Sequence, residues 1–471
     1  MRGAGPKGGL LRPPDQPGRR CQYGAGPGLL VVLGLAAGAS LWLTHPGRPG
    51  KPWAVSFLVG YAAAWLCWVA AGLIVNRGRP FPGWVLAWII ACAVALRVIC
   101  LARAPQTSTD VWRYLWDGRV ANSGINPYDY PPNAPELRHF RDRNWRAINY
   151  RHLPTIYPPA AQVLFLGLAR LRSGDAEAFR WAFMLFDIGS VGVLVALLRR
   201  TRRQAERVVW YAWCPLAVTE ATAGAHVDAY GVFLLLVALL LAARAAGRPG
   251  RASAVVLGLS VMAKGPALLV APLFARFGGW RAAAWCAATC IALALPYAGA
   301  GRRAFGGLSA YIAAWETNAS IFLVLDHLLA RITSVHFGLT RVLTTAGVVL
   351  GVGLLTGRLR PGAEWLLGAT FAAFGVSLLL GAPTLPWYVM WVVPALCWWE
   401  IPALIAFALT VSVQYYARWI WPSDAVRYAL LWAGYVPVYS LLAAQAARWR
   451  RLATARAPAP PGAPQQASGP S

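Results

Sequence analysis

The chain has 471 residues, of which 58% are hydrophobic and only 13% are charged. A soluble globular protein has about a quarter of its residues charged, so this composition excludes an ordinary soluble enzyme. The net charge of +27 does not indicate nucleic-acid binding, because most arginines lie in short loops and tails and no basic domain is present. The eight cysteines form no Cys-x-x-Cys pattern and no Cys/His spacing that fits zinc. The chain is therefore predicted to be an all-α polytopic membrane protein.

Apolar segments suited to crossing a bilayer recur along the whole chain, and a bundle of about twelve transmembrane spans is predicted from them. Residues 1–27 are basic and rich in Pro and Gly, and residues 452–471 are of low complexity, so both tails are expected to be disordered. The protein is expected to be a multi-pass protein of the cell membrane. The candidate spans are residues 28–44, 53–75, 83–102, 178–198, 208–224, 228–246, 280–298, 338–357, 363–381, 386–399, 401–420 and 425–446.

The placement of arginine predicts the orientation of this bundle, because short loops rich in Arg or Lys stay on the cytoplasmic side. Both tails and the basic runs at 199–207 and 244–251 are therefore predicted to be cytoplasmic. The large polar loops then fall on the extracytoplasmic face. The predicted organisation is N-terminal transmembrane helices at 28–102, an extracytoplasmic catalytic loop with interfacial helices at 103–177, central transmembrane helices at 178–298, a second extracytoplasmic loop at 299–337 and C-terminal transmembrane helices at 338–451.

Two further apolar segments do not cross the membrane fully in this arrangement. Residues 157–171 are predicted to lie on the outer surface as an interfacial helix. Residues 252–275 are predicted to enter from the cytoplasm and return, with a break at the sequence KGP, residues 264–266. In the alternative arrangement both segments cross, which keeps the downstream orientation but places the arginines of 199–207 outside.

The densest polar and aromatic cluster, TSTDVWRYLWDGRVANSGINPYDYPP at residues 107–132, follows the third span. Asp110 is expected at the membrane–water boundary, where it is either a favourable charge in the first turn of a helix or a catalytic carboxylate. Ser108 or Thr109 is placed to cap that helix. Asp117 and Arg113 fall on the same helix face as Asp110, and a carboxylate beside an arginine is usually an ion pair.

The rest of this loop also carries signals of function. Residues 103–156 hold eight arginines against five acids, which the positive-inside rule disfavours on the outer face. The loop is therefore expected to hold an anionic lipid phosphate. Trp112, Tyr114 and Tyr128 suit the headgroup region as an aromatic belt, and these rings, together with Tyr157, are also candidates for stacking on sugar rings.

Ionisable residues inside apolar segments are candidates for function. Lys264 is one of only three lysines in the chain and lies in GLSVMAKGPALLVAPL, where it either binds a ligand or extends toward the interface from a helix end. His226 and Asp228, in GAHVDAYG, are too few ligands for a metal site by themselves, and no metal or cofactor is predicted. Asp187 and Glu220 are interpreted as structural, with Arg180 or Trp181 as possible partners.

Several segments, in this order along residues 100–400, resemble the GT-C superfamily of polyprenyl-phosphate-dependent glycosyltransferases, and in particular its family 87 branch of α-mannosyltransferases. The more specific of them are DVWRYLWDG with GINPY, and the YPP of LPTIYPPAAQVLF. The others are AWCPLAVTEATAGAHVDAYGVFLLL, GLSVMAKGPALLVAPL, ETNASIFLVL and PTLPWYVMWVVPAL.

The resemblance implies a GT-C-like helix bundle and roles for the candidate residues. An acid in the first large outer loop is the catalytic base in that superfamily, which implies Asp110 here. Basic groups hold the phosphate of the lipid donor, and Lys264, Arg113 and His226 are candidates for this role. Asp117 and Asp228 are alternatives for a second acid, which leaves metal dependence open. Asp228 is also a candidate for contacting the acceptor or sugar, with the aromatic residues above.

The expected reaction moves a sugar, with mannose implied by the resemblance, from a polyprenyl monophosphate to a lipid or glycan acceptor, with inversion at the anomeric carbon. Membrane lipids are expected partners and nucleic acid is not. A lipid transporter or flippase is the alternative. It would explain Lys264 but predicts matching broken helices in two repeats, and only one break is found. A non-catalytic scaffold would not explain the arginine-rich outer loop.

Overall fold

The computed structural model describes residues 24–43, 51–78, 80–103, 107–172, 174–417, 420–421 and 423–455. Throughout these residues the chain is helical, without a β-strand. Seven of the described helices are long and apolar enough to cross a membrane. The prediction of an all-α polytopic membrane protein is therefore confirmed. Of the two predicted disordered tails, residues 1–23 and 456–471 lie outside the described residues, whereas the last helix continues to Ala455.

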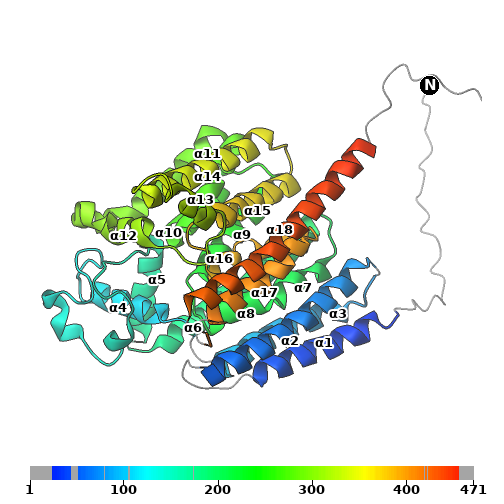
Figure 1. Ribbon diagram of the computed structural model, residues 1–471, viewed down its shortest axis with the longest axis horizontal. Helices are drawn as coiled ribbons and strands as arrows, with labels where there is room; N and C mark the ends of the chain where they lie inside the picture. Colours follow the sequence, from blue (N-terminus) through cyan, green and yellow to red (C-terminus); the bar gives the residue numbers. More distant parts are fainter. Residues whose placement is uncertain are drawn as a thin grey trace, which may run out of the picture.

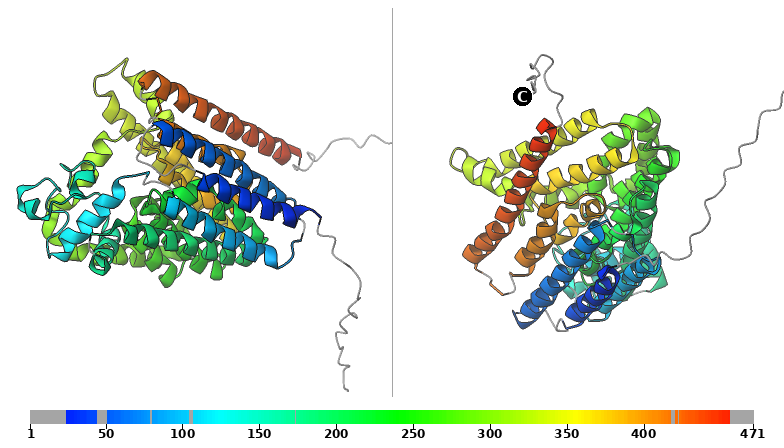
Figure 2. Two further views of the ribbon diagram at one scale, coloured as in Figure 1. Left: turned by 90° about the horizontal axis from the view of Figure 1, so that it is seen from below. Right: turned by 90° about the vertical axis from the view of Figure 1, so that its right-hand side faces the viewer.

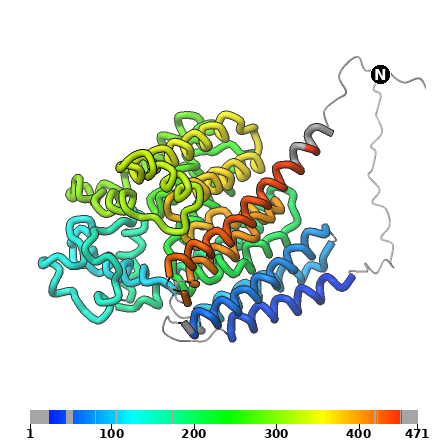
Figure 3. The backbone as a smooth tube through the Cα atoms, in the orientation of Figure 1, coloured from blue at the N-terminus to red at the C-terminus, as the bar shows by residue number. Residues whose placement is uncertain are grey.

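The helices form one elongated bundle with a cap at one end, built from residues 107–172 and 299–337 (Figures 1 and 3). The first three helices pack together along one side, and the last helix, α18, runs diagonally across the bundle (Figure 2). The α-helices are α1 Gly26–Trp42, α2 Lys51–Asn76, α3 Trp84–Arg103, α4 Asp110–Asn122, α5 Pro159–Leu171, α6 Ala176–Arg200, α7 Val209–Ala212, α8 Pro215–Thr222, α9 Asp228–Arg244, α10 Arg251–Ala263, α11 Ala271–Ala294, α12 Gly306–Ala314, α13 Ile321–Leu329, α14 His336–Arg358, α15 Ala363–Leu380, α16 Pro386–Val389, α17 Pro402–Ala417 and α18 Asp424–Ala455.

Two of the predicted spans are not continuous helices. Residues 208–224 form the short helices α7 and α8, with Pro215 at the start of α8. Residues 386–399 form α16 and a 3-10 turn, Val393–Cys397, each begun by a proline. Proline lacks the backbone N–H and fits the first turn of a helix but not its interior, so each apolar run is divided. Both segments are almost entirely buried at the centre of the bundle.

The predicted break at residues 264–266 is present. Helix α10 ends at Ala263, Lys264 has extended backbone, and a 3-10 turn, Gly265–Val270, leads into α11. The chain then returns toward the start of α10, because a Cβ atom on Gly278 would lie 2.6 Å from the carbonyl oxygen of Pro249. The stretch 251–278 is thus a helical hairpin whose tip is Lys264.

The two ends of the bundle differ in which loops they gather. At one end, Arg203 pairs with Glu364 and Arg200 donates to the carbonyl oxygen of Ala243, which brings three of the short basic loops together. At the other end, Arg303 pairs with Asp129 at 3.1 Å, so the two large polar loops meet there. Helices α4, α5 and α12 lie at this second end (Figure 1).

One buried ion pair differs from the sequence prediction. Asp187 of α6 pairs with Arg97 of α3, whose Nε lies 2.6 Å from its Oδ2, and Tyr211 also donates to it. Arg180 does not reach Asp187, because its guanidinium binds Glu177 and two backbone carbonyls. Burying a charge requires a partner, but the sequence does not show which arginine the packing of α3 on α6 brings near.

The cap is held by close packing of α4 on α5. A Cβ atom on Gly118 would lie 2.3 Å from the carbonyl oxygen of Phe165, so only glycine permits this approach. We expect Gly118→Ala to separate the two helices and to lower the thermal unfolding temperature in detergent. Gly167→Ala, on α5 itself, meets no atom within 4 Å and is the matched control. Equal melting temperatures for the two variants would contradict this account of the packing.

Candidate active site

The site is built around the start of helix α4. Asp110 is the first residue of α4, and its backbone N–H donates to Ser108 Oγ at 3.2 Å, whereas the side chain of the N-cap residue, Thr109, makes no capping hydrogen bond. The carboxylate itself accepts hydrogen bonds from Asn149 Nδ2 at 3.2 Å and from the hydroxyl of Tyr157 at 3.4 Å. The Asp110 side chain is 20% exposed. It is therefore oriented by side chains of its own loop and remains accessible.

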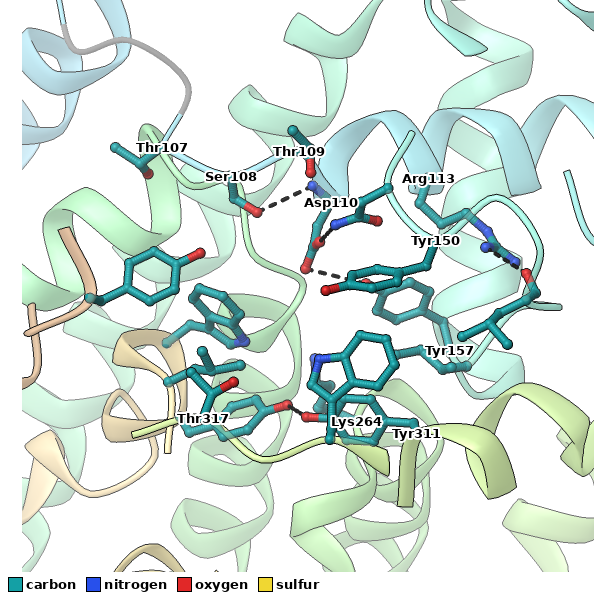
Figure 4. Close-up of a pocket in the computed structure, with 18 of the residues that line it drawn as sticks. Thr107, Ser108, Thr109, Asp110, Arg113, Tyr150, Tyr157, Lys264, Tyr311 and Thr317 are labelled. Atoms are coloured by element: carbon teal, nitrogen blue, oxygen red, sulfur yellow. Dashed lines mark hydrogen bonds between the residues drawn. The ribbon is translucent and has the colours of Figure 1, made fainter. Parts of the chain in front are cut away.

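Asp110 faces a cavity of about 510 Å³ at the capped end of the bundle (Figure 4). The lining comes from six parts of the chain: the start of α4 with the residues before it, the segment before α5, the tip of the 251–278 hairpin, the end of α12 with the residues after it, the start of α16, and α17. Its lining residues are Thr107, Ser108, Thr109, Asp110, Arg113, Asn149, Tyr150, Leu153, Pro154, Ile156, Tyr157, Lys264, Tyr311, Trp315, Thr317, Leu385, Trp387, Tyr388 and Tyr415.

Lys264 lies on the wall of this cavity, with its side chain 13% exposed. Its Nζ is 3.0 Å from Oδ2 of Asp228, the first residue of α9, and Trp391 Nε1 donates to the other oxygen of that carboxylate. The ammonium also lies 5.4 Å from the ring centroid of Tyr157 and 5.7 Å from that of Tyr388. Asp228 does not line the cavity. Lys264 thus presents an ammonium group to the cavity, and the buried carboxylate of Asp228 lies behind that group.

Arg113 and Asp117 form an ion pair on α4, with Nε and Oδ1 2.8 Å apart. Thr155 and Gln162 also donate to Asp117, which is 2% exposed and does not line the cavity. The guanidinium of Arg113 is further engaged by the carbonyl oxygen of Leu153. Asp117, predicted as an alternative second acid, has a buried carboxylate that joins α4 to α5 and to the segment before it and does not line the cavity.

His226 lies behind Asp110 rather than on the cavity wall. Its Nε2 is 4.0 Å from Oδ2 of Asp110, and its Nδ1 is 3.0 Å from Oε2 of Glu220. The ring stacks on Trp387 at a centroid distance of 3.8 Å. With only 1% of its side chain exposed, His226 is not placed to bind the donor phosphate. The structure instead places His226 beside Asp110, the candidate catalytic base.

Of the four predicted sugar-contacting aromatics, the structure brings only Tyr157 to the cavity. Burial, followed by the charge of Asp110, raises the pKa of Tyr157 well above its usual value, which keeps its hydroxyl a donor to Asp110. Tyr114 stacks on Phe165 in the core, and Tyr128 donates to the carbonyl oxygen of Tyr157. Trp112 packs between two hydrophobic clusters. These three rings pack within the cap and are not among the lining residues of the cavity.

The sequence prediction missed most of the aromatic lining. Tyr150 and Trp315 meet edge to face at 4.3 Å, and the hydroxyls of Tyr311 and Tyr388 are 2.5 Å apart. Trp315 directly precedes ETNASIFLVL, and Tyr388 lies within PTLPWYVMWVVPAL. Both segments contribute to the family resemblance, but the sequence predicts no role for these two rings. Tyr150 is 52% exposed and has a φ of 46°, the left-handed region that non-glycine residues rarely adopt. Such strain is found at functional sites more often than elsewhere.

Within the described residues, no group of three or more His, Cys, Asp or Glu side chains could hold a metal ion. The cavity thus presents the carboxylate of Asp110, the ammonium of Lys264 and a set of aromatic rings, together with Arg113, whose guanidinium is already engaged by Asp117. That combination suits general-base chemistry on a neutral, hydroxyl-rich molecule with an anionic leaving group.

Comparison with known proteins gives one family. Residues 23–278, which are more than half of the chain, match the family model described as alpha-(1→6)-mannopyranosyltransferase, N-terminal domain. This region includes Asp110, His226 and Lys264 and ends at the base of the hairpin. No curated protein and no solved structure matches the chain.

Proposed function

The chain belongs to the alpha-(1→6)-mannopyranosyltransferase family, and we propose that it transfers mannose from a polyprenyl monophosphate donor to a hydroxyl of a glycan or lipid-linked acceptor, with inversion at the anomeric carbon. It is a membrane protein of the GT-C type, and we place it in the cell membrane. The family membership favours transfer over the transport alternative. The observation that carries the proposal is that Asp110 and Lys264 line the same cavity.

The proposed reaction assigns one role to each group. Asp110 takes the proton of the acceptor hydroxyl, and the acceptor oxygen attacks C1 of a β-linked mannosyl phosphate from the face opposite the phosphate. The bond between C1 and the phosphate oxygen breaks, and its electron pair stays on the phosphate. The product is an α-mannoside, in keeping with the family description, and the leaving group is the polyprenyl phosphate.

Lys264 is proposed to stabilise the leaving phosphate. Cations aimed at the atom where charge develops stabilise a transition state more than the ground state. The Lys264 ammonium is exposed to the cavity, whereas the guanidinium of Arg113 is bound to Asp117 and Leu153. Lys264 is also the residue at which α10 stops, so its backbone lies at the tip of the hairpin, within reach of a phosphate that a membrane lipid carries.

The acceptor is proposed to enter past Tyr150 and Trp315. These rings lie in the lining and meet across the two large loops. Asn149, next to Tyr150, is hydrogen-bonded to Asp110, so a sugar ring resting on this aromatic pair would bring a hydroxyl toward the carboxylate. Flat aromatic faces with a few polar groups are typical of small-molecule binding sites.

The active site is proposed to face the extracytoplasmic side. The short basic loops gather at one end of the bundle and the cavity is at the other, which is the arrangement that the positive-inside rule favours. We expect a single cysteine at His139 to be labelled by an impermeant thiol reagent in intact cells, and one at Arg199 only after permeabilisation, in a background without native cysteines. The reverse pattern would invert the proposed orientation.

Lys264→Met should weaken use of the donor, raising its KM or lowering kcat, because the phosphate loses its cation. The change also leaves Asp228 buried without its partner, which can destabilise the fold on its own. The double variant Lys264→Met/Asp228→Asn removes that complication. If the double variant regains wild-type kinetics, Lys264 serves only to neutralise Asp228, whereas continued impairment in a well-folded double variant supports the phosphate role.

Asp110→Asn is the direct test of the proposed function. Asparagine keeps the shape, and its one oxygen can still accept one of the two hydrogen bonds that Asn149 and Tyr157 donate, but it cannot take the acceptor's proton. A positioned general base contributes about 10²–10⁴-fold in rate, and we expect transfer of radiolabelled mannose to fall by that factor with an unchanged melting temperature.

Asp142→Asn provides the matched control, since Asp142 is a carboxylate of the same loop that pairs with Arg119. We expect this variant to transfer mannose at close to the wild-type rate. Wild-type turnover in Asp110→Asn would refute the general-base assignment and leave Asp110 as a helix-start charge.

A further inference from the structure

Behind Asp110, the buried side chains of His226, Glu220 and Tyr416 form a row that the reaction described above does not use. Nε2 of His226 points to Asp110 at 4.0 Å, Nδ1 lies 3.0 Å from Glu220, and Tyr416 donates to the other oxygen of Glu220 at 3.0 Å. None of these three side chains lines the cavity. Neither ring nitrogen of His226 has a well-aligned hydrogen-bond partner in this structure, although both are buried.

The local backbone is shaped to make this row. The turn after α8 contains Ala225 with a φ of 50°, and the N–H of His226 donates to the carbonyl oxygen of Glu220 at 3.0 Å. A Cβ atom on Gly224 would lie 2.6 Å from Nδ1 of His226 and 3.0 Å from Oε2 of Glu220. Glycine at this position is thus what allows the imidazole and the carboxylate to approach each other.

The neighbours of the ring determine which nitrogen carries its proton. An ionised carboxylate only accepts hydrogen bonds, so Glu220 favours a proton on Nδ1. The neutral imidazole then turns the lone pair of Nε2 toward Asp110. Trp387 stacks on the ring face and prevents the imidazole from rotating. The groups that face His226 are therefore Asp110 from α4, Glu220 from α8 and Trp387 from α16, with Tyr416 from α17 behind Glu220.

We propose that His226 is a positioning residue that assists Asp110 as a base. This inference rests on the proposed function. Before the reaction, the lone pair of Nε2 faces an ionised carboxylate, which has no hydrogen to donate, so no hydrogen bond forms between them. Once Asp110 has taken the proton of the acceptor hydroxyl, its O–H can donate to Nε2 or pass the proton on to it. The imidazolium formed in that step is stabilised by Glu220, and Asp110 returns to the carboxylate form.

This interaction exists only after proton transfer, which is the condition for an effect on rate rather than on binding. It also explains why a carboxylate is backed by a buried histidine instead of an arginine. A permanent cation would lower the proton affinity of Asp110 and weaken it as a base, whereas a neutral imidazole fixed by Glu220 favours the protonated form. The separation of 4.0 Å shortens when substrate orders the site, as catalytic hydrogen bonds commonly do.

The test compares His226→Gln, Glu220→Gln and Asp110→Asn in steady-state transfer of mannose from a polyprenyl phosphate donor. We expect His226→Gln to lower kcat roughly 10- to 100-fold, less than loss of the base itself, with an unchanged KM for the donor.

Glu220→Gln is the second variant, and its effect has a defined sign. A carboxylate accepts the proton of Nδ1 and stabilises an imidazolium, whereas a neutral amide stabilises it less. We therefore expect kcat to fall while the donor KM and the melting temperature stay unchanged. This split is a readout that a purely structural role would not produce, and it remains available if His226→Gln folds poorly.

The double variant Asp110→Asn/His226→Gln separates this inference from the proposed function. If His226 acts through Asp110, the double variant transfers no more slowly than Asp110→Asn alone. A further loss comparable to that of His226→Gln would show an independent role and overturn the inference, as would wild-type kcat in His226→Gln or an increase confined to the donor KM. Each of these results leaves the proposed function standing, provided that Asp110→Asn shows the large but measurable loss of transfer expected for the base.

Discussion

The ion pair between Lys264 and Asp228 is the contact on which the geometry of the site depends. A charge buried among apolar helices requires a partner, and these two residues meet at 3.0 Å. Because Asp228 is the first residue of α9 and Lys264 directly follows the last residue of α10, their pairing brings these two helix ends to one level. The extended backbone at Lys264 then lets the chain turn back. This pair thus fixes where the hairpin turns and places the Lys264 ammonium at the cavity.

The turn between α8 and α9, with the helix ends that flank it (residues 220–228), also positions Asp110 on the other side of the cavity. His226 faces Asp110, and Asp228, two residues later, faces Lys264. The loop that carries Asp110 is tied to this turn through the backbone, because the N–H of Thr107 donates to the carbonyl oxygen of Ala223 at 3.2 Å. Residues 220–228 therefore act as a common support for both sides of the cavity. A shift of this turn would move the base and the cation together and preserve their relation.

The sequence supported those predictions that depend on local chemistry. Asp110 could be placed at a helix start from the preceding Thr and Ser residues, and the break at Lys264 followed from Gly265 and Pro266. It could not show how polar groups are partnered across the fold. Arg97 and Asp187 are 90 residues apart in the chain.

The roles of the aromatic residues could not be predicted from the sequence for a related reason. Rings that suit a membrane interface, a protein core and a sugar site have the same composition, and only packing distinguishes Tyr114 in the core from Tyr150 at the cavity.

The arginine-rich outer loop was expected to hold the lipid phosphate, yet its arginines mainly bind within the loop. Arg119 pairs with Asp142, Arg141 donates to the carbonyl oxygen of Asn133, and the guanidinium of Arg151 lies 4.4 Å from the ring centroid of Trp145. A long loop with little regular structure leaves many carbonyl oxygens without partners, and the five N–H donors of arginine can satisfy them. Among the described arginine side chains of this loop, only Arg113 lines the cavity, and Asp117 already engages it.

In the proposed reaction, recognition of the donor phosphate falls to Lys264, whose charge Asp228 already balances in the resting site. A phosphodiester donor carries one negative charge, and cleavage of its bond to C1 adds a second. An ammonium shared between Asp228 and the phosphate interacts more strongly with the phosphate as that charge grows. Because Asp228 neutralises Lys264 before the reaction, the ammonium binds the ground-state donor weakly. It therefore stabilises mainly the transition state, in which the phosphate carries more negative charge.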